Sequence, residues 1–348
     1  MDAAGSALDV AVVGIGRMGS HHARVYHEHQ TANLVAVVDC DAQRAAETAR
    51  RYGCNSYANV GHLIDHHPAL RAASVVVPTD RHRDVAAPLL RAGVACLIEK
   101  PLAGSSADAR ALATLAEDRG AVLQVGHTER FNPAVQAIAA MNITPRFVEV
   151  QRISPMSFRS MDVSVVMDMM IHDLDIVLML AGALPTRVDA TGIAVFGPHE
   201  DLANARLVFA NGCVANLTSS RLALKTERKL RLFSEEAYVS LDYQAGNGMV
   251  IRKSDNAEIL DKLRNSVAAG EDLTDLDYAG LVQAEQLRMD GNGERRDPLT
   301  DQISSFLISA AAGGDPQVNA VAGCAAVETA ERVMHALRQH RWEGMTGV

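Results

Sequence analysis

The sequence predicts two domains: an α/β domain built on a doubly wound parallel sheet, and an α+β domain built on a large, mostly antiparallel open sheet. Over the first third of the 348 residues, short β-branched runs alternate with helical patterns, which is typical of a parallel sheet. After about residue 126, strand-like segments follow one another with tight turns, which is typical of an antiparallel sheet. Because a domain holds roughly 100–200 residues, we place the two domains at 1–126 and 127–348.

The first domain is expected to alternate strand and helix throughout. Its first strand, Leu8–Val13, runs into a glycine-rich turn, and a helix follows to about His29. Asp41 is a good N-cap for a second helix, and Gly53 is a good residue to end it. The other expected strands are Leu34–Val38, Ser74–Val77, Ala95–Ile98 and Ala121–Val125, and the other expected helices are Arg81–Gly93 and Ser105–Gly120.

The second domain is expected to begin with a short helix opened by Asn132 and Pro133. Val163–Leu180 is long, apolar and rich in methionine, and is interpreted as a buried helix. Asn211–Gly212 is a strong hairpin turn. The polar, acidic segment 253–297 is expected to be an irregular loop. The expected strands are Phe147–Ile153, Val188–Phe196, Ala203–Phe209, Val214–Ser220, Lys229–Phe233 and Tyr238–Leu241, and the expected closing helices are Gln302–Ala312 and Ala322–Arg338.

Composition excludes several classes of protein. Lys plus Arg number 33 against 42 Asp plus Glu, so the net charge of −9 argues against nucleic acid as a partner. No apolar run approaches the ~20 residues that a membrane span needs, so we expect no membrane partner. The five cysteines are scattered and contain no CxxC pair, which argues against disulfides and zinc–cysteine sites and favours the cytoplasm.

The glycine pattern GIGRMG joins the first strand to the first helix. Gly14 permits a tight turn, Gly16 lets a pyrophosphate approach the backbone, and Gly19 lets the helix pack on the strand. The N–H groups and positive dipole at the helix start then bind the anion. Asp39 ends the second strand, where its carboxylate can accept hydrogen bonds from ribose hydroxyls and repel a 2′-phosphate. The motif predicts a Rossmann domain that prefers NAD to NADP; the alternative is a glycine turn without a ligand.

A lysine follows the fourth strand, in the run Glu99-Lys100-Pro101. Doubly wound sheets bind ligands at the C-terminal ends of their strands. Lys100 could there hydrogen-bond a substrate hydroxyl and stabilise developing negative charge. Its position alone is equally consistent with a surface lysine beside a turn proline.

Three polar residues interrupt the apolar stretch Val163–Leu180: Asp168, His172 and Asp175. Their spacings of four and three place them on one face of a helix. Because buried charges are costly unless paired, such a stripe is expected to line a cleft, with His172 as a general base and Asp168 as its partner. The alternatives are a helix with satisfied surface acids and a metal site. No further cluster of strong metal ligands in the sequence supports a metal site.

The remaining histidines are interpreted without a functional role. Four of them lie on or beside the first helix, and a pair lies in a loop further along the chain. No cysteine or carboxylate pattern accompanies them, so we expect the helix histidines to form a solvated face. These residues are His21, His22, His27 and His29 on the helix, and His66 and His67 in the loop.

Four segments resemble the Gfo/Idh/MocA oxidoreductase family, and the similarity covers nearly the whole chain. They are VVGIGRMGSHH (12–22), VPTDRHRDVAAPLLRAGVACLIEKPLA (77–103), VGHTERFNP (125–133) and DMMIHDLD (168–175). The resemblance implies that Lys100, Asp168 and His172 form the catalytic group, the same residues that the spacing isolates. It also implies that 1–126 binds NAD and that 127–348 binds substrate and forms oligomers. The expected cofactor-binding residues are Gly14, Gly16, Arg17, Met18, Gly19, Asp39, Pro78, Thr79, His82, Glu99 and Lys100.

Within the family, the second half of the chain is similar to sugar-nucleotide 3-dehydrogenases, in particular the type that acts on UDP-N-acetylglucosamine. The similar segments are GHTERFNP, Arg152–Ile176 and Asp201–Phe233. One departure is Met169-Met170-Ile171, where the family more commonly has a glycine between the Asp and the His. We expect this departure to reshape the nicotinamide or sugar pocket.

Several cationic groups in this acidic protein could bind a diphosphate. The expected substrate-binding residues are Arg130, Asn132 and Arg159, together with Asp168 and His172. Further candidates are Arg152 and Arg221. For each arginine the alternative is a surface ion pair.

The resemblance therefore implies an NAD-dependent dehydrogenase that oxidises the 3-hydroxyl of UDP-N-acetylglucosamine. The 3-keto product would pass to an aminotransferase that makes a diamino-sugar precursor of lipid A. The alternatives are an inositol, polyol or free-sugar dehydrogenase of the same family, and a non-catalytic NAD-sensing regulator. An open sheet that must cover one face predicts a homodimer or homotetramer.

Overall fold

The computed structural model describes residues 7–156, 163–253, 257–271, 282–287 and 297–341. The chain forms two compact units. The first consists of Met1–Asn132, Leu174–Ile176 and Arg295–Met334, and the second of Pro133–Asp173, Val177–Glu294 and His335–Val348. Two helices, α7 (Ile171–Ala181) and α10 (Ala320–Gln339), contribute residues to both units.

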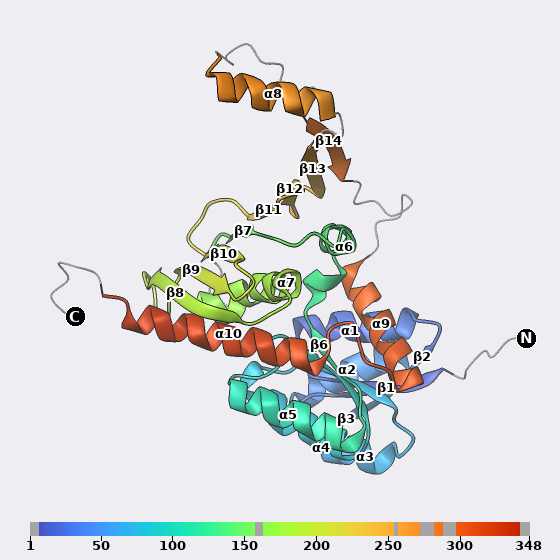
Figure 1. Ribbon diagram of the computed structural model, residues 1–348. Coiled ribbons are helices and arrows are strands. Elements are labelled where there is room, and N and C mark those ends of the chain that lie inside the picture. Colours follow the sequence, from blue (N-terminus) through green and yellow to red (C-terminus); the bar gives the residue numbers. More distant parts are fainter. Residues whose placement is uncertain (1–6, 157–162, 254–256, 272–281, 288–296, 342–348) are drawn as a thin grey trace, which may run out of the picture. The chain divides into compact units, whose positions relative to one another are not determined.

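The first unit contains a six-stranded parallel sheet in the order β3-β2-β1-β4-β5-β6. Its strands have the blue to green colours of Figure 1. This is the strand order of a doubly wound dinucleotide-binding fold, with its switch point between β1 and β4. The predicted parallel sheet is thus confirmed, and its ligand edge lies at the C-terminal ends of these strands. The strands are β1 Leu8–Val13, β2 Ala32–Val38, β3 Asn55–Tyr57, β4 Ala72–Val75, β5 Ala95–Glu99 and β6 Leu123–Gly126.

Helices cover this sheet. α1 and α9 share one hydrophobic core with the strands, in which Tyr26 of α1 and Phe306 of α9 are fully buried. α9 begins at Pro298 rather than at Gln302 because the Asp297 carboxylate caps its first turn by accepting the Leu299 N–H. The helices of this unit are α1 Arg17–Glu28, α2 Ala42–Tyr52, α3 Val60–His66, η1 Thr79–Arg81, α4 His82–Arg91, α5 Ser106–Arg119, η2 Thr128–Phe131 and α9 Pro298–Ala312.

One strand and one α-helix of the first unit, β3 and α3, were not predicted. β3 is three residues of mostly exposed polar side chains, so it carries no hydrophobic alternation. α3 is a single short helix that Asn59 caps by accepting the His62 N–H, and His66, which we expected in a loop, ends it. Short elements such as these bury too little apolar surface to leave a pattern in the sequence.

The second unit contains an eight-stranded sheet in the order β14-β13-β12-β11-β7-β10-β9-β8. Every neighbouring pair is antiparallel except β7 and β10, so the predicted mostly antiparallel sheet is confirmed. The predicted hairpin joins β9 to β10, where Gly212 has the positive φ of 83° that the turn requires. The strands are β7 Phe147–Ile153, β8 Pro185–Ile193, β9 Leu202–Phe209, β10 Val214–Ser220, β11 Glu227–Phe233, β12 Ala237–Asp242, β13 Asn247–Lys253 and β14 Val282–Leu287.

The expectation of an irregular loop over 253–297 is wrong for the part that the structure describes. α8 (Ala257–Ala269) is a helix, and β14 pairs with β13 at the edge of the sheet. The four central side chains of β14 are exposed. An edge strand that is exposed to solvent has no need of apolar residues, which explains why its sequence looks like a loop.

The Met-rich helix is not one continuous α-helix. A π-helical turn, η4 (Val166–Met170), precedes α7. Ser164 starts it: its hydroxyl accepts the Val166 N–H, and its carbonyl accepts the N–H groups of Met167 and Asp168. π-turns widen the helix locally and often occur at functional sites. The other helix of this unit, α6 (Pro133–Ala140), begins at Pro133 as predicted.

Candidate active site

The glycine-rich loop has the geometry that a bound pyrophosphate needs. Gly14 has a φ of 89°, and a Cβ there would lie 2.3 Å from the Val76 carbonyl oxygen. A Cβ on Gly19 would lie 1.8 Å from the Gly14 carbonyl oxygen. A Cβ on Gly16, in contrast, would meet nothing within 4 Å. Gly14 and Gly19 therefore serve close packing, whereas Gly16 leaves open space beside the backbone.

The N-terminal end of α1 has the properties of an anion-binding site. Among the described residues, no side chain caps the helix at Gly16, so its first N–H groups keep their hydrogen-bonding capacity. Arg17 and Met18 are exposed there. Because the helix dipole places partial positive charge at this end, the loop fits the pyrophosphate of a dinucleotide.

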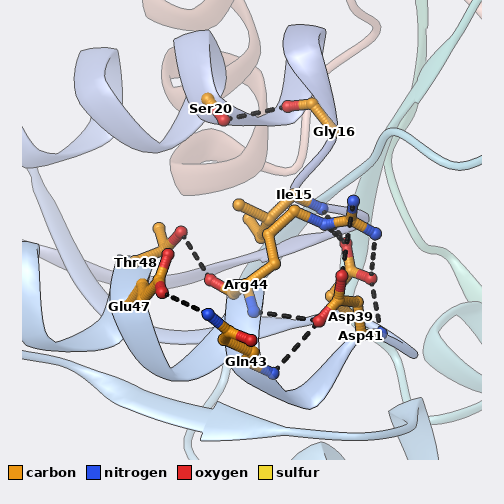
Figure 2. A network of polar contacts seen from close by, with 9 residues as sticks. All are labelled: Ile15, Gly16, Ser20, Asp39, Asp41, Gln43, Arg44, Glu47 and Thr48. Atoms are coloured by element: carbon orange, nitrogen blue, oxygen red, sulfur yellow. Dashed lines mark hydrogen bonds and ion pairs between the residues drawn. The ribbon is translucent and has the colours of Figure 1, made fainter.

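Asp39 forms a network at the end of β2 (Figure 2). Its two oxygens accept the N–H groups of Ile15 at 2.7 Å and Asp41 at 2.9 Å, and both contact the Arg44 guanidinium, at 3.1 and 2.8 Å. Burial alone would raise the pKa of Asp39, but Arg44 and the two amides outweigh burial and lower that pKa. The four bonds fill the acceptor positions of a carboxylate. Any further hydrogen-bond donor at Asp39 would have to replace one of these four bonds, and two of them come from Arg44, whose side chain is 46% exposed.

The segment after β4 contains the predicted cofactor contacts Pro78, Thr79 and His82. Pro78 is exposed and Thr79 is half-buried. His82 is buried: its Nδ1 lies 2.9 Å from the Pro101 carbonyl oxygen and its Nε2 lies 2.9 Å from the Val77 carbonyl oxygen. Burial lowers the pKa of His82, although the carbonyl groups oppose this. His82 thus ties the loop after β4 to the loop after β5.

Lys100 lies half-buried directly after β5, at the ligand edge of the sheet. Its backbone N–H donates to Glu99 Oε2 at 3.2 Å. Glu99 Oε1 in turn lies 3.1 Å from His22 Nε2. His22 is fully buried, so the expectation that all the histidines of the first helix form a solvated face is wrong for this residue. The sequence analysis looked for a cysteine or carboxylate pattern beside the helix histidines, and it missed His22 because its partners Ser74 and Glu99 lie 52 and 77 residues further along the chain.

His127 is a second histidine that the sequence analysis did not single out. It follows β6, is fully buried, and neither of its ring nitrogens has a hydrogen-bond partner among the described residues. Burial lowers the pKa of His127, Asp175 raises it, and Arg130 and Lys100 lower it. A polar residue at the C-terminal end of a parallel strand was the available signal.

The predicted polar stripe divides into two parts. Asp168 in η4 and His172 in α7 are half-buried residues of the second unit. Asp175 is 1% exposed and belongs to the first unit, where its carboxylate accepts hydrogen bonds from Arg130 at 2.6 and 2.9 Å. Asp175 therefore has a structural partner within the first unit, whereas Asp168 and His172 belong to the second unit.

The arginines considered for a diphosphate have specific partners. Arg152 pairs with Asp173 through two contacts of 2.8 Å, and Arg221 pairs with Asp201 at 2.6 Å. These side chains are at most 6% exposed, so the pairs are buried rather than superficial. The Asn132 amide donates to Glu129 at 3.2 Å. Arg159 lies outside the described residues.

Two further observations bear on the class of protein. Within the described ranges, no three His, Cys, Asp or Glu side chains gather as they would around a metal ion. None of the described helices has both the length and the apolar character needed to cross a membrane.

Two family models match the chain. Residues 8–127 match the "Oxidoreductase family, NAD-binding Rossmann fold" model, and residues 146–240 match the "GFO/IDH/MocA C-terminal domain" model. Together they include the glycine-rich loop, Lys100, Asp168 and His172.

Individual proteins are similar as well. The UDP-N-acetylglucosamine 3-dehydrogenase of Acidithiobacillus ferrooxidans is 40% identical over 237 residues, which cover 68% of this chain and 74% of that protein. A solved structure of that enzyme superimposes with a TM-score of 0.83, covering 95% of this chain and 98% of the other at 33% identity. An inositol 2-dehydrogenase of Rhizobium meliloti is 29% identical and covers 61% of this chain and 68% of its own length.

Proposed function

The chain belongs to the Gfo/Idh/MocA family of NAD-binding oxidoreductases, and we propose that it oxidises the 3-hydroxyl of UDP-N-acetylglucosamine to a ketone. The choice of substrate rests on sequence identity. This chain is 40% identical to the Acidithiobacillus enzyme and 29% identical to the inositol dehydrogenase. Membership of an enzyme family argues against the alternative of a non-catalytic NAD sensor.

The residues have complementary chemical roles in this proposal. NAD, when bound, supplies the acceptor for the hydride that leaves the carbinol carbon. His172 takes the proton of the hydroxyl as general base, and Asp168 orients the imidazole. The Lys100 ammonium hydrogen-bonds the same oxygen and stabilises the negative charge that develops on it. The glycine-rich loop and Asp39 bind the pyrophosphate and the adenosine ribose.

Arg130 and Asn132 remain candidates for the diphosphate of the substrate, with a restricted role for Arg130. Two N–H groups of Arg130 are engaged by Asp175, so it would contribute its positive charge and its remaining donors. Arg159 stays a candidate on its sequence position alone.

A substrate panel tests the proposal. Purified protein is incubated with NAD and UDP-N-acetylglucosamine, other nucleotide sugars, free sugars or inositol, and NADH is followed by its absorbance. We expect reduction with UDP-N-acetylglucosamine and competitive inhibition by UDP. Turnover of inositol or a free sugar without inhibition by UDP would support the polyol alternative, and the absence of turnover with every substrate while NAD binds would contradict both.

We also propose that the second unit forms the contact in a homodimer or homotetramer. One face of its sheet is open: Phe147, Phe233 and Tyr238 pack against one another there, with Phe233 39% exposed. Beside them lies a groove of about 600 Å³ whose lining, from β11 to β14, is mostly polar and charged, with Met249 among its few apolar residues. Partly exposed aromatic side chains beside a polar surface are typical of an interface with an apolar centre and a polar rim. Light scattering coupled to size exclusion tests this; a monomer at micromolar concentration would contradict it.

The chemistry of the product indicates which class of reaction follows this one. A 3-keto nucleotide sugar is a substrate for transamination, so we propose an aminotransferase as the next enzyme, in a pathway to a diamino-sugar lipid A precursor. The five free cysteines support a reducing compartment such as the cytoplasm. Conversion of the oxidation product to an amino sugar by a coupled aminotransferase and an amino donor tests the sequence of steps.

A further inference from the structure

A chain of buried polar side chains lies behind Lys100. Tyr26 Oη lies 2.8 Å from Ser74 Oγ, and Ser74 Oγ lies 3.0 Å from His22 Nδ1. His22 Nε2 lies 3.1 Å from Glu99 Oε1, and Glu99 Oε2 accepts the Lys100 N–H. Tyr26, Ser74 and His22 are all 0% exposed. The chain connects α1, which follows the glycine-rich loop, to the backbone of the lysine.

With a neutral imidazole at His22, one arrangement of protons satisfies every contact in this chain. A carboxylate only accepts hydrogen bonds, so His22 Nε2 carries the proton and donates to Glu99. His22 Nδ1 is then an acceptor for the Ser74 hydroxyl, and Ser74 accepts the Tyr26 hydroxyl. Burial raises the pKa of Tyr26, which keeps its hydroxyl protonated as that donor.

The carboxylate of Glu99 has little freedom to move. A Cβ on Gly126 of the neighbouring strand β6 would lie 2.9 Å from the Glu99 carboxyl carbon, so the backbone of β6 lies close against it. Burial would raise the pKa of Glu99, but His22, the charge of Lys100 and the Lys100 N–H outweigh burial and lower that pKa. Glu99 therefore stays ionised and accepts from both His22 and Lys100.

We infer that His22 is a positioning residue for Lys100, which acts by holding the Glu99 carboxylate in the orientation that accepts the Lys100 N–H. The inference rests on the proposed function, because that function gives Lys100 its task. His22 itself contacts neither substrate nor cofactor in this account. Since His22 lies on the helix that begins at the cofactor loop, the same helix orients both the dinucleotide and the lysine.

Other groups act on Glu99 besides His22. Lys100 faces it from its own segment, His82 from α4, and His127 from the residue after β6. The two buried histidines at 82 and 127 have lowered pKa values and so contribute little positive charge near neutral pH. His22 is the hydrogen-bonded partner whose removal changes Glu99 most directly.

Two amide substitutions separate positioning from mere packing. In His22→Gln the side-chain nitrogen reaches the place of Nε2 and can still donate to Glu99. In His22→Asn the shorter amide reaches only the place of Nδ1, so it keeps the contact with Ser74 and loses Glu99. We expect kcat to fall about 10- to 100-fold in His22→Asn and within about threefold in His22→Gln, with KM and NAD affinity nearly unchanged in both.

The pH profile gives a second readout. Removing a donor from an ionised carboxylate raises its pKa, so the acid limb of the kcat profile should move to higher pH in His22→Asn and stay in place in His22→Gln. His27→Ala changes an exposed histidine in the last turn of the same helix and serves as the control. A uniform loss of kcat at every pH in His22→Asn would point to packing alone and would contradict the inference.

Hydrogen exchange of the cofactor-free protein tests the inference apart from the reaction. The Lys100 amide donates to Glu99, so its exchange should become faster in His22→Asn and remain slow in His22→Gln and His27→Ala. If His22→Asn does not fold, Ser74→Ala, which removes the support of Nδ1, should give the same changes in smaller measure. Unchanged exchange and unchanged kcat in the folded variants overturn the inference. A wild-type protein without turnover overturns the proposed function and leaves the exchange test intact.

Discussion

The ion pair at the ligand edge of the first sheet differs from two buried ion pairs of the second unit. At the ligand edge of the first sheet, Asp39 is paired with Arg44, whose side chain is 46% exposed. In the second unit, Arg152 and Arg221 are paired with Asp173 and Asp201, and all four side chains are at most 6% exposed. The exposed partner can be exchanged for a ligand at small cost, whereas breaking a buried pair leaves an uncompensated charge.

The exposure of each ion pair therefore indicates which charged side chains can bind a ligand. The arginines that the sequence offered for a diphosphate, Arg152 and Arg221, instead hold the second unit together. Arg221 also donates to the Val163 carbonyl, just before the π-turn that carries Asp168. In the first unit, Arg130 and Asp175 form a comparable buried pair, whereas the Asp39–Arg44 pair at the end of β2 keeps an exposed partner.

The largest expected effect is that of Lys100→Ala. Loss of the group that stabilises the developing negative charge should reduce kcat by about 10³- to 10⁴-fold. NAD affinity should change little, because the glycine-rich loop and Asp39 remain. Steady-state kinetics together with NAD titration check this, with Lys225→Ala, at an exposed position in the second unit, as the control. Activity within threefold of wild type would remove Lys100 from the reaction.

Arg152→Ala should act on stability rather than on binding. It leaves Asp173 buried without its partner, which costs about 3–4 kcal/mol of the free energy of unfolding. Replacing both members, as Arg152→Met with Asp173→Leu, should recover most of this loss, because no charge is then left unpaired. Urea denaturation of the three proteins measures the difference. Equal stability of Arg152→Ala and wild type would show that this pair is exchangeable after all.

Asp39→Ser should act on binding rather than on stability. We expect NAD affinity to fall about 10- to 100-fold, because a charged acceptor of ribose hydrogen bonds is lost. The affinity for NADP relative to NAD should rise, since Arg44 remains and the repelling carboxylate is gone. Titration with both dinucleotides checks this. Asp41→Asn, which keeps the cap of α2, is the matched control; an unchanged preference in Asp39→Ser would separate Asp39 from cofactor choice.

A smaller effect concerns pH and the Asp201–Arg221 pair. Burial would raise the pKa of Asp201, but the N–H groups of Phe196 and Val195 and the Arg221 side chain lower it. A lowered pKa contributes stability that is complete above the ordinary value of 3.8 and is lost as the pH falls through the native value. The double variant Asp201→Asn with Arg221→Gln should therefore lose less stability than wild type between pH 6 and pH 3. Parallel acid transitions in thermal unfolding would contradict this.

Sequence reasoning succeeded where local spacing carries the information. Consecutive elements near the start of the chain carry Gly14, Gly16, Gly19 and Asp39. The fold class alone therefore predicts where these four residues lie. It failed where partners are distant in the sequence. His22 contacts Glu99 across 77 residues of sequence, and Arg130 contacts Asp175 across 45. β14 was missed because an exposed edge strand leaves no apolar alternation.

The proposed reaction makes one measurement decisive. UDP-N-acetylglucosamine deuterated at C3 is incubated with the enzyme and NAD, and the reduced cofactor is analysed by mass spectrometry. Our account predicts that the reduced cofactor gains one deuterium and that turnover slows, whereas substrate deuterated at C4 gives unlabelled NADH at the normal rate. NADH that carries no deuterium from C3, or that carries it from C4, would contradict the proposed chemistry.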